Sequence, residues 1–165
     1  MSAPSMAQQL TEATQLQRLR ALRERKALQA SQQAEREAQA AQQVVLEREA
    51  QIRQLQARRL ELQHSLVGTY AARMGVVARY ASAAQEALDD QLERAEYALI
   101  DEEEALISAR ARAVAARKAW LQAVAQHQAS TTLRDDARHS LRRERETMLE
   151  REDPPAAART LRNTP

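Results

Sequence analysis

The chain has 165 residues, of which 29% are charged and 2% aromatic, and it contains neither Cys nor Phe. The formal net charge of +2 reflects dense and nearly balanced opposite charges, which disfavours a dedicated nucleic-acid binder. The lack of Cys excludes disulfides and thiolate metal sites. Ala, Glu, Leu, Arg and Gln dominate the composition, which is typical of long helices or coiled coils.

The first 15 residues have no apolar core of the signal-peptide type. No uncharged apolar run approaches 18 residues, the length from which a membrane-spanning helix is considered. We therefore expect a soluble, cytoplasmic protein without membrane insertion.

Helix-breaking residues predict where the helices begin and end. The prolines lie only at residues 4, 154, 155 and 165, and the two glycines are Gly68 and Gly75. Since interior Pro and Gly interrupt helices, one helix is predicted over about 5–67 and a second over about 76–152. Ser5 and Gln8 have the spacing of a capping box for the first helix. Thr69, or a start just after Gly75, is expected to begin the second.

Each helix is expected to be on the order of 90–115 Å long and needs a partner to bury its apolar stripe. The single short break makes the other helix the nearest partner. The predicted fold is therefore all-α, a long two-helix antiparallel coiled-coil hairpin over residues 1–153. Residues 154–165 are expected to form a disordered tail.

Heptad spacing supports the pairing of the two helices. One seam of the second helix contains Leu92, Leu99, Leu106, Ala113, Trp120, His127, Arg134, Leu141 and Met148. Its companion seam contains Leu88, Ala95, Glu102, Ala109, Ala116, Ala123, Ser130 and Ala137. The first helix has a weaker stripe of Ala34, Ala38, Ala41, Val45, Ile52, Leu55, Leu62 and Leu66. Near its start, Leu16, Leu19, Leu22 and Leu28 fall in another register, which predicts a stutter.

Charges on the flanks give a further prediction about register. With a turn near residue 71, the basic residues Arg53, Arg58 and Arg59 fall opposite an acidic stretch that contains Glu86, Asp89 and Asp90. Such pairs contribute little energy each but select register and orientation.

The sequence shows no pattern of catalytic chemistry. Two isolated glycines do not make a phosphate-binding loop. His64, His127 and His139 lack metal-ligand spacing with one another, and Asp135 with His139 is more typical of a solvated helix pair than of a metal site. Residues 101–104 are all acidic, but four consecutive helical side chains point around the helix and predict a solvated acidic face. We expect no enzymatic activity, no cofactor and no metal.

Three surfaces are candidates for binding a protein partner. In an antiparallel hairpin two Arg-rich blocks lie toward the open end, where they suit carboxylates on a partner; solubility and pairing along the helix explain them equally well. These blocks are Arg18, Arg20, Arg23 and Arg25, followed by Lys26, and Arg138, Arg142, Arg143 and Arg145. The third surface is the turn, where Tyr and Met residues either bind a partner or only close the turn. It comprises Tyr70, Met74, Val76, Val77 and Tyr80. Trp120 lies among alanines and is predicted to pack in the core.

Residues 116–153, ARKAWLQAVAQHQASTTLRDDARHSLRRERETMLERED, place a Trp in a basic helix before Gln-rich and Arg/Glu-rich turns. In this segment, and in size and helical organisation, the chain resembles the FliJ/YscO family, the stalk proteins of flagellar and virulence-type type III secretion systems. The resemblance implies a stalk that inserts its open end into the secretion ATPase ring. It also implies a contact between the start of the second helix and the export gate, and contacts with secretion chaperones.

Carried over to this chain, the resemblance implies that the Arg blocks face the ATPase and that Met74, Val77 and Tyr80 face the gate. The protein would then lie in the cytoplasm, at the periphery of the inner-membrane secretion apparatus, as an elongated monomer. Two other interpretations stay open. One is a generic scaffold whose helices pair between chains. The other is a basic-helix nucleic-acid binder, which is disfavoured because Ala30, Ala34, Ala38 and Ala41 follow the basic block where leucine heptads are expected.

Overall fold

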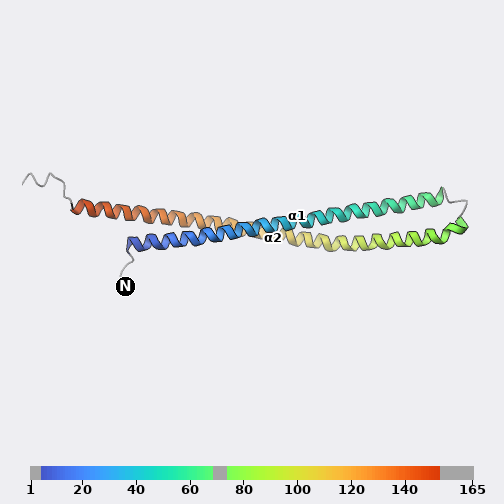
Figure 1. The fold of residues 1–165 in the computed structure, drawn as a ribbon, viewed down its shortest axis with the longest axis horizontal. Helices are drawn as coiled ribbons and strands as arrows, with labels where there is room; N and C mark the ends of the chain where they lie inside the picture. Colours follow the sequence, from blue (N-terminus) through green and yellow to red (C-terminus); the bar gives the residue numbers. More distant parts are fainter. Residues whose placement is uncertain (1–4, 69–73, 153–165) are drawn as a thin grey trace, which may run out of the picture. The chain divides into compact units, whose positions relative to one another are not determined.

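The protein folds into two helices that pack against each other, as a computed structural model shows for residues 5–68 and 74–152. Helix α1 comprises Met6–Val67 and helix α2 comprises Met74–Glu152 (Figure 1). No strand is present among these described residues. The predicted all-α helical hairpin is confirmed. Residues 1–4, 69–73 and 153–165, among them Tyr70 and the predicted tail, lie outside the described part.

The first turn of α1 is fixed by a capping box. The backbone N–H of Gln8 donates to Ser5 Oγ at 3.3 Å, and the N–H of Ser5 donates to Gln8 Oε1 at 2.9 Å. These two hydrogen bonds satisfy donors that the start of a helix leaves without intrahelical acceptors. The capping box predicted from Ser5 and Gln8 is confirmed.

The end of α1 and the start of α2 differ slightly from the predicted helix boundaries. Helix α1 ends at Val67, after which the N–H of Gly68 donates to the carbonyl of His64 at 3.0 Å. Helix α2 begins at Met74, so Gly75 lies inside the helix instead of preceding it. One glycine within a helix costs only about 1 kcal/mol, which the rest of a long helix easily offsets. Thr69, the alternative cap, lies outside the described residues.

The chain divides into two compact units. Unit 1 consists of Met1–Gln29 and Arg117–Pro165, and unit 2 consists of Ala30–Ala116. In both units a segment of α1 and a segment of α2 run side by side in opposite directions (Figure 1). The direction in unit 2 follows from its ion pairs, since Arg48 contacts Glu102 whereas the later residue Arg59 contacts the earlier Asp89.

The core of unit 2 is a narrow apolar seam. One cluster of buried residues in this seam consists of Ile52 and Leu55 from α1 and Ala95 from α2, with exposed fractions of 9%, 6% and 3%. Leu88, Leu92 and Leu99 pack around them and are half-buried. The small side chain of Ala95 allows the two backbones to approach closely, while the surrounding leucines supply the buried apolar area.

The heptad predicted for α2 is confirmed by burial. All of its predicted seam positions from Leu88 to Leu141 are buried or half-buried, and only the final one, Met148, is exposed. The polar member Ser130 is completely buried, and its hydroxyl donates to the carbonyl of His127 at 2.7 Å. This local hydrogen bond removes the cost of burying an unpaired hydroxyl in the seam.

The stutter predicted for α1 is wrong, because one heptad register continues through the whole helix. Leu16, Leu19 and Leu22 remain 37%, 57% and 54% exposed. The residues that face α2 in these turns are instead buried or half-buried, and many of them are polar. Every seventh residue from 10 onward belongs to this register, namely Leu10, Gln17, Glu24, Ser31, Ala38, Val45, Ile52, Arg59 and Leu66. The second set is Ala13, Arg20, Ala27, Ala34, Ala41, Arg48, Leu55 and Leu62.

The polar residues are accepted in the seam of unit 1 because α2 supplies partners for them. Arg134 donates through Nη1 to Gln17 Oε1 at 3.3 Å, and His127 Nδ1 lies in hydrogen-bond contact with a carboxylate oxygen of Glu24. A polar group that is paired in this way can occupy a half-buried seam at little cost. Leu16, Leu19 and Leu22 are therefore left on the outer side of α1.

The predicted charge pairing across the seam is confirmed at one of its positions. Arg59 Nε lies 3.0 Å from Asp89 Oδ1, an ion pair by distance although its angles are not those of a hydrogen bond. Arg53 instead pairs with Glu49 of its own helix at 3.7 Å, and Asp90 with Arg94 at 3.9 Å. The last two pairs are largely exposed, so each contributes little to stability, whereas Arg59 and Asp89 are half-buried.

Candidate partner-binding surfaces

The Arg block of α1 presents three exposed side chains and one that is used within the fold. Arg18, Arg23 and Arg25 are exposed, as is the neighbouring Lys26. Arg20 is half-buried and donates through Nη1 to the carbonyl oxygen of Gln126 on α2 at 2.9 Å. A partner can therefore reach three of the four predicted arginines directly, while the fourth ties α1 to α2 within unit 1.

The Arg block of α2 is exposed at all four positions, Arg138, Arg142, Arg143 and Arg145. Arg142 Nε donates to Glu146 Oε1 at 2.9 Å, four residues along the same helix. Three of the arginines line an open groove of about 500 Å³. The groove is lined by Leu10, Asp135, Arg138, His139, Leu141, Arg142 and Arg145.

Both Arg blocks belong to unit 1. Although the whole chain is nearly neutral, its positive and negative charges are distributed unequally between the two units. Among the described residues, unit 1 has 13 Lys and Arg against 8 Asp and Glu, a net charge of +5. Unit 2 has 9 against 14, a net charge of −5. A concentration of one sign raises the local potential and attracts oppositely charged partners. Unit 1 is thus suited to an acidic protein surface, which the total charge did not indicate.

Exposed apolar side chains accompany the arginines of unit 1. Leu19 and Leu22 lie between the arginines of α1 and are more than half exposed. On α2, Leu133 and Leu149 are 54% and 65% exposed. Protein–protein interfaces typically combine apolar contact area with arginines. This mixture of side chains therefore fits a protein partner better than a partner bound by charge alone.

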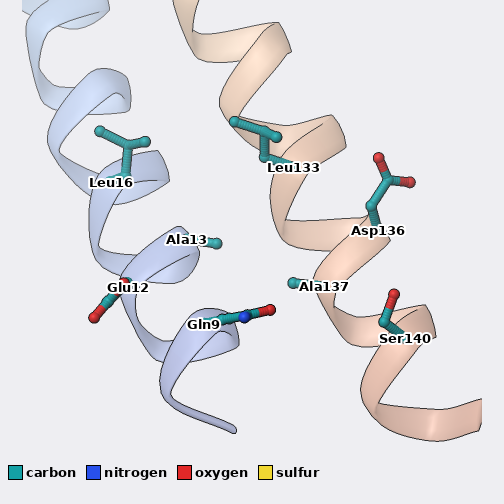
Figure 2. A pocket seen from close by; sticks show the side chains of 8 residues that line it. All are labelled: Gln9, Glu12, Ala13, Leu16, Leu133, Asp136, Ala137 and Ser140. Atoms are coloured by element: carbon teal, nitrogen blue, oxygen red, sulfur yellow. The ribbon is translucent and has the colours of Figure 1, made fainter. Parts of the chain in front are cut away.

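A second groove in unit 1 lies between the two helices and has a volume of about 570 Å³ (Figure 2). Figure 2 shows Ala13 of α1 and Ala137 of α2 pointing toward one another. Because two alanines meet in the same layer, the space between the backbones is not filled. The groove is lined by Gln9, Glu12, Ala13, Leu16, Leu133, Asp136, Ala137 and Ser140. Sequence reasoning assigned Ala137 to the seam but did not match it with Ala13, which lies in the part of α1 that was given the wrong register.

The surface predicted at the turn is only partly described. Tyr80 is 79% exposed near the start of α2. Met74 and Val77 belong to the first turn of α2, but their side chains, like that of Val76, lie outside the described part. The outward position of Tyr80 leaves its ring and hydroxyl accessible to a partner.

The acidic run at residues 101–104 is not entirely a solvated face, because Glu102 takes part in the seam of unit 2. Arg48 donates to the Glu102 carboxylate through Nε at 3.1 Å and through Nη2 at 2.6 Å, and both side chains are half-buried. The hydrogen bond to Glu102 raises the pKa of Arg48 above its usual value, and partial burial opposes the rise. Sequence reasoning placed Glu102 in the seam but missed its partner, although Arg48 lies midway between Val45 and Ile52.

Trp120 is half-buried at its heptad position in unit 1. Its indole nitrogen is covered from solvent and has no hydrogen-bond acceptor among the described residues. This placement supports the predicted role in packing. Asp135, considered with His139 as a metal-ligand pair, instead accepts hydrogen bonds from Arg134 at 2.6 and 3.0 Å.

In the described ranges, no group of three or more His, Cys, Asp or Glu side chains is arranged to hold a metal ion. Neither described helix contains a segment that is both long and apolar enough to cross a bilayer. Comparison of the chain with models of protein families, with curated proteins and with solved structures gives no match.

Proposed function

We propose that the chain is a non-enzymatic stalk or adaptor of a type III secretion system, linking the secretion ATPase ring to the export gate. The proposal rests on the concentration of exposed arginines in unit 1, which is basic, whereas unit 2 is acidic. The resemblance of residues 116–153 to the FliJ/YscO family supplies the identity of the partners.

The chemistry of unit 1 supports an acidic protein partner. Seven exposed arginines from the two predicted blocks present planar guanidinium groups, which bind carboxylates through two parallel hydrogen bonds. The exposed leucines beside them offer apolar area that a nucleic-acid backbone does not need. We therefore assign unit 1 to the ATPase.

The start of α2 supports a second contact, separate from the first along the chain. Tyr80 is exposed, and tyrosine contributes large contact area at low entropic cost. We assign this surface, with Met74 and Val77, to the export gate. Secretion chaperones are further partners that the family resemblance implies.

Charge reversal tests the ATPase contact. The variant R142E/R143E/R145E should lose retention on the immobilised cognate ATPase by at least about tenfold, because several charge-assisted contacts are replaced by repulsion. The matched control R36E/R58E/R112E reverses three exposed arginines of unit 2 and should be retained like the wild type. Equal retention of both variants would refute the assignment of the Arg block.

Two further tests distinguish a secretion stalk from the other interpretations. A secretion stalk should be encoded next to a secretion ATPase, so the neighbouring genes provide an independent check. A basic-helix nucleic-acid binder should instead be retained on duplex DNA with a steep dependence on salt. Such retention, together with loss of ATPase binding, would favour the nucleic-acid interpretation.

A further inference from the structure

A second apolar stripe runs along α2 in unit 2, outside the seam with α1. Ile100, Ile107 and Val114 are 52%, 67% and 70% exposed. They are spaced by seven residues, so they lie above one another on one face of the helix. Each directly follows a residue of the seam, which turns it about 100° away from the buried face. The stripe is therefore a heptad repeat that the contact with α1 leaves uncovered. Its part in unit 2 consists of these three residues, and the next heptad position, Leu121, which is 54% exposed, belongs to unit 1.

Neither solubility nor helix formation explains these three residues. At exposed helical positions, Ala, Glu, Lys and Arg form helices better than the β-branched Ile and Val. The exposed positions around the stripe indeed hold such residues, for example Glu103, Glu104 and Arg110. Large β-branched side chains repeated at heptad spacing are instead the residues that pack a helix against another helix.

The charges that flank the stripe change sign along it. Glu103 and Glu104 lie on the N-terminal side of Ile107, and Arg110 lies on its C-terminal side. Within the described residues neither glutamate makes an ion pair, and the one contact of Arg110 is a hydrogen bond from Nη2 to Gln42 Oε1 at 3.3 Å. The flank is thus acidic before the middle of the stripe and basic after it, and these charges can pair with those of a partner.

A pattern of this kind is complementary to itself in the antiparallel direction. When two copies of α2 cross with Ile107 at the twofold axis, residue 100 faces residue 114 of the other copy, and residue 104 faces residue 110. Ile would then pack on Val, and Glu104 would meet an arginine at both ends of the contact. In a parallel arrangement Glu104 would instead face a glutamate, which is repulsive.

We propose that the stripe of Ile100, Ile107 and Val114 is the docking surface for a second copy of this chain, bound antiparallel about a twofold axis at Ile107. A symmetric contact uses the same patch on both copies, as the self-complementary charges require. Three apolar layers make a small interface, so we expect a reversible dimer with a dissociation constant on the order of 10–100 µM. The predicted monomer then describes the protein at low concentration only.

The stripe lies in unit 2, whereas the Arg blocks assigned to the ATPase lie in unit 1. The proposed dimer therefore does not depend on the proposed function. Loss of one can be measured in variants that leave the other unchanged.

Sedimentation equilibrium of the full chain tests the proposal over a range of about 5 to 500 µM, which brackets the expected dissociation constant. The mass should rise from 18.6 kDa toward twice that value. The variant I107E should raise the dissociation constant at least tenfold, since two carboxylates would meet at the axis. The control L60E places the same charge on an exposed leucine of α1 in unit 2 and should dimerise like the wild type.

A charge exchange tests the antiparallel register. The variant E104R should weaken the dimer by setting arginine against Arg110 of the second copy, and E104R/R110E should restore it. Helicity measured by circular dichroism should be the same in all variants, because the changed residues are exposed. A wild type that stays monomeric throughout the range, a dimer that I107E leaves intact, or a double exchange without recovery would each overturn the proposal.

Discussion

Replacing Ile52 by Ala should destabilise unit 2 by about 2–3 kcal/mol. Ile52 is 9% exposed and packs with Leu55 and Ala95 in a buried apolar cluster of the seam. The change removes three carbon atoms, and at about 0.8 kcal/mol for each buried carbon the transfer contribution alone is about 2.4 kcal/mol. The surrounding Leu88 and Leu92 are only half-buried and can relax into the space. The additional cavity contribution should therefore be small, which places the cost near the lower end of the range of about 2–5 kcal/mol.

The measurement is urea unfolding followed by circular dichroism, with the free energy of unfolding obtained by linear extrapolation. The variant I107A is the matched control, because it makes the same chemical change at a side chain that is 67% exposed. Its cost should stay within about 0.5 kcal/mol, as is usual for surface positions. A protein concentration of about 0.5 µM, well below the expected dissociation constant, keeps the proposed dimer largely dissociated. The reasoning would be refuted if both variants lost the same stability, since burial would then not distinguish the two faces of the hairpin.

The remaining predictions concern the polar parts of the seam. The variant L22Q should change the free energy of unfolding by less than about 0.5 kcal/mol, because Leu22 is 54% exposed. A loss of about 2 kcal/mol or more, as expected for a buried leucine, would instead support the stutter. R48Q should lower the midpoint of thermal unfolding, because it leaves the half-buried Glu102 carboxylate without its cation, whereas R48L/E102L should recover most of the loss. A double variant less stable than R48Q would contradict this account. Since the pKa of Arg48 is raised, the stability due to its charge is present below the ordinary pKa of arginine and is lost only when the pH rises through the folded value. Unfolding measured between pH 7 and pH 10 should therefore show no loss from this group.

The separation of charge between the two units has a consequence for partner binding. Salt weakens attraction between exposed charges over about 8–10 Å at physiological ionic strength. Binding through the basic unit 1 should accordingly be sensitive to salt, whereas the apolar stripe of unit 2 should be much less so. This difference offers a simple way to tell which surface a newly found partner uses.

The sequence by itself determined the helices and much of their pairing. Prolines occur only near the ends and glycines only at residues 68 and 75, which left one place for a break. The other residue types adopt the helical conformation at a cost of at most about 0.7 kcal/mol each. The capping box at Ser5 followed from local hydrogen bonding between residues three apart. The register of α2 followed from leucines spaced by seven, because residues at this spacing lie on one face of the helix and that apolar face is buried.

The tertiary structure decided what local pattern could not. The leucines of the first turns of α1 suggested a second register, but the face that is buried depends on contacts with residues about 100 positions later. Glu24 meets His127 and Gln17 meets Arg134, so polar residues take the seam and Leu22 stays outside. For the same reason the sequence identified the Arg blocks but not that Arg20 is engaged with Gln126. Helix formation is local, whereas the choice of buried face is a pairwise property of two distant segments.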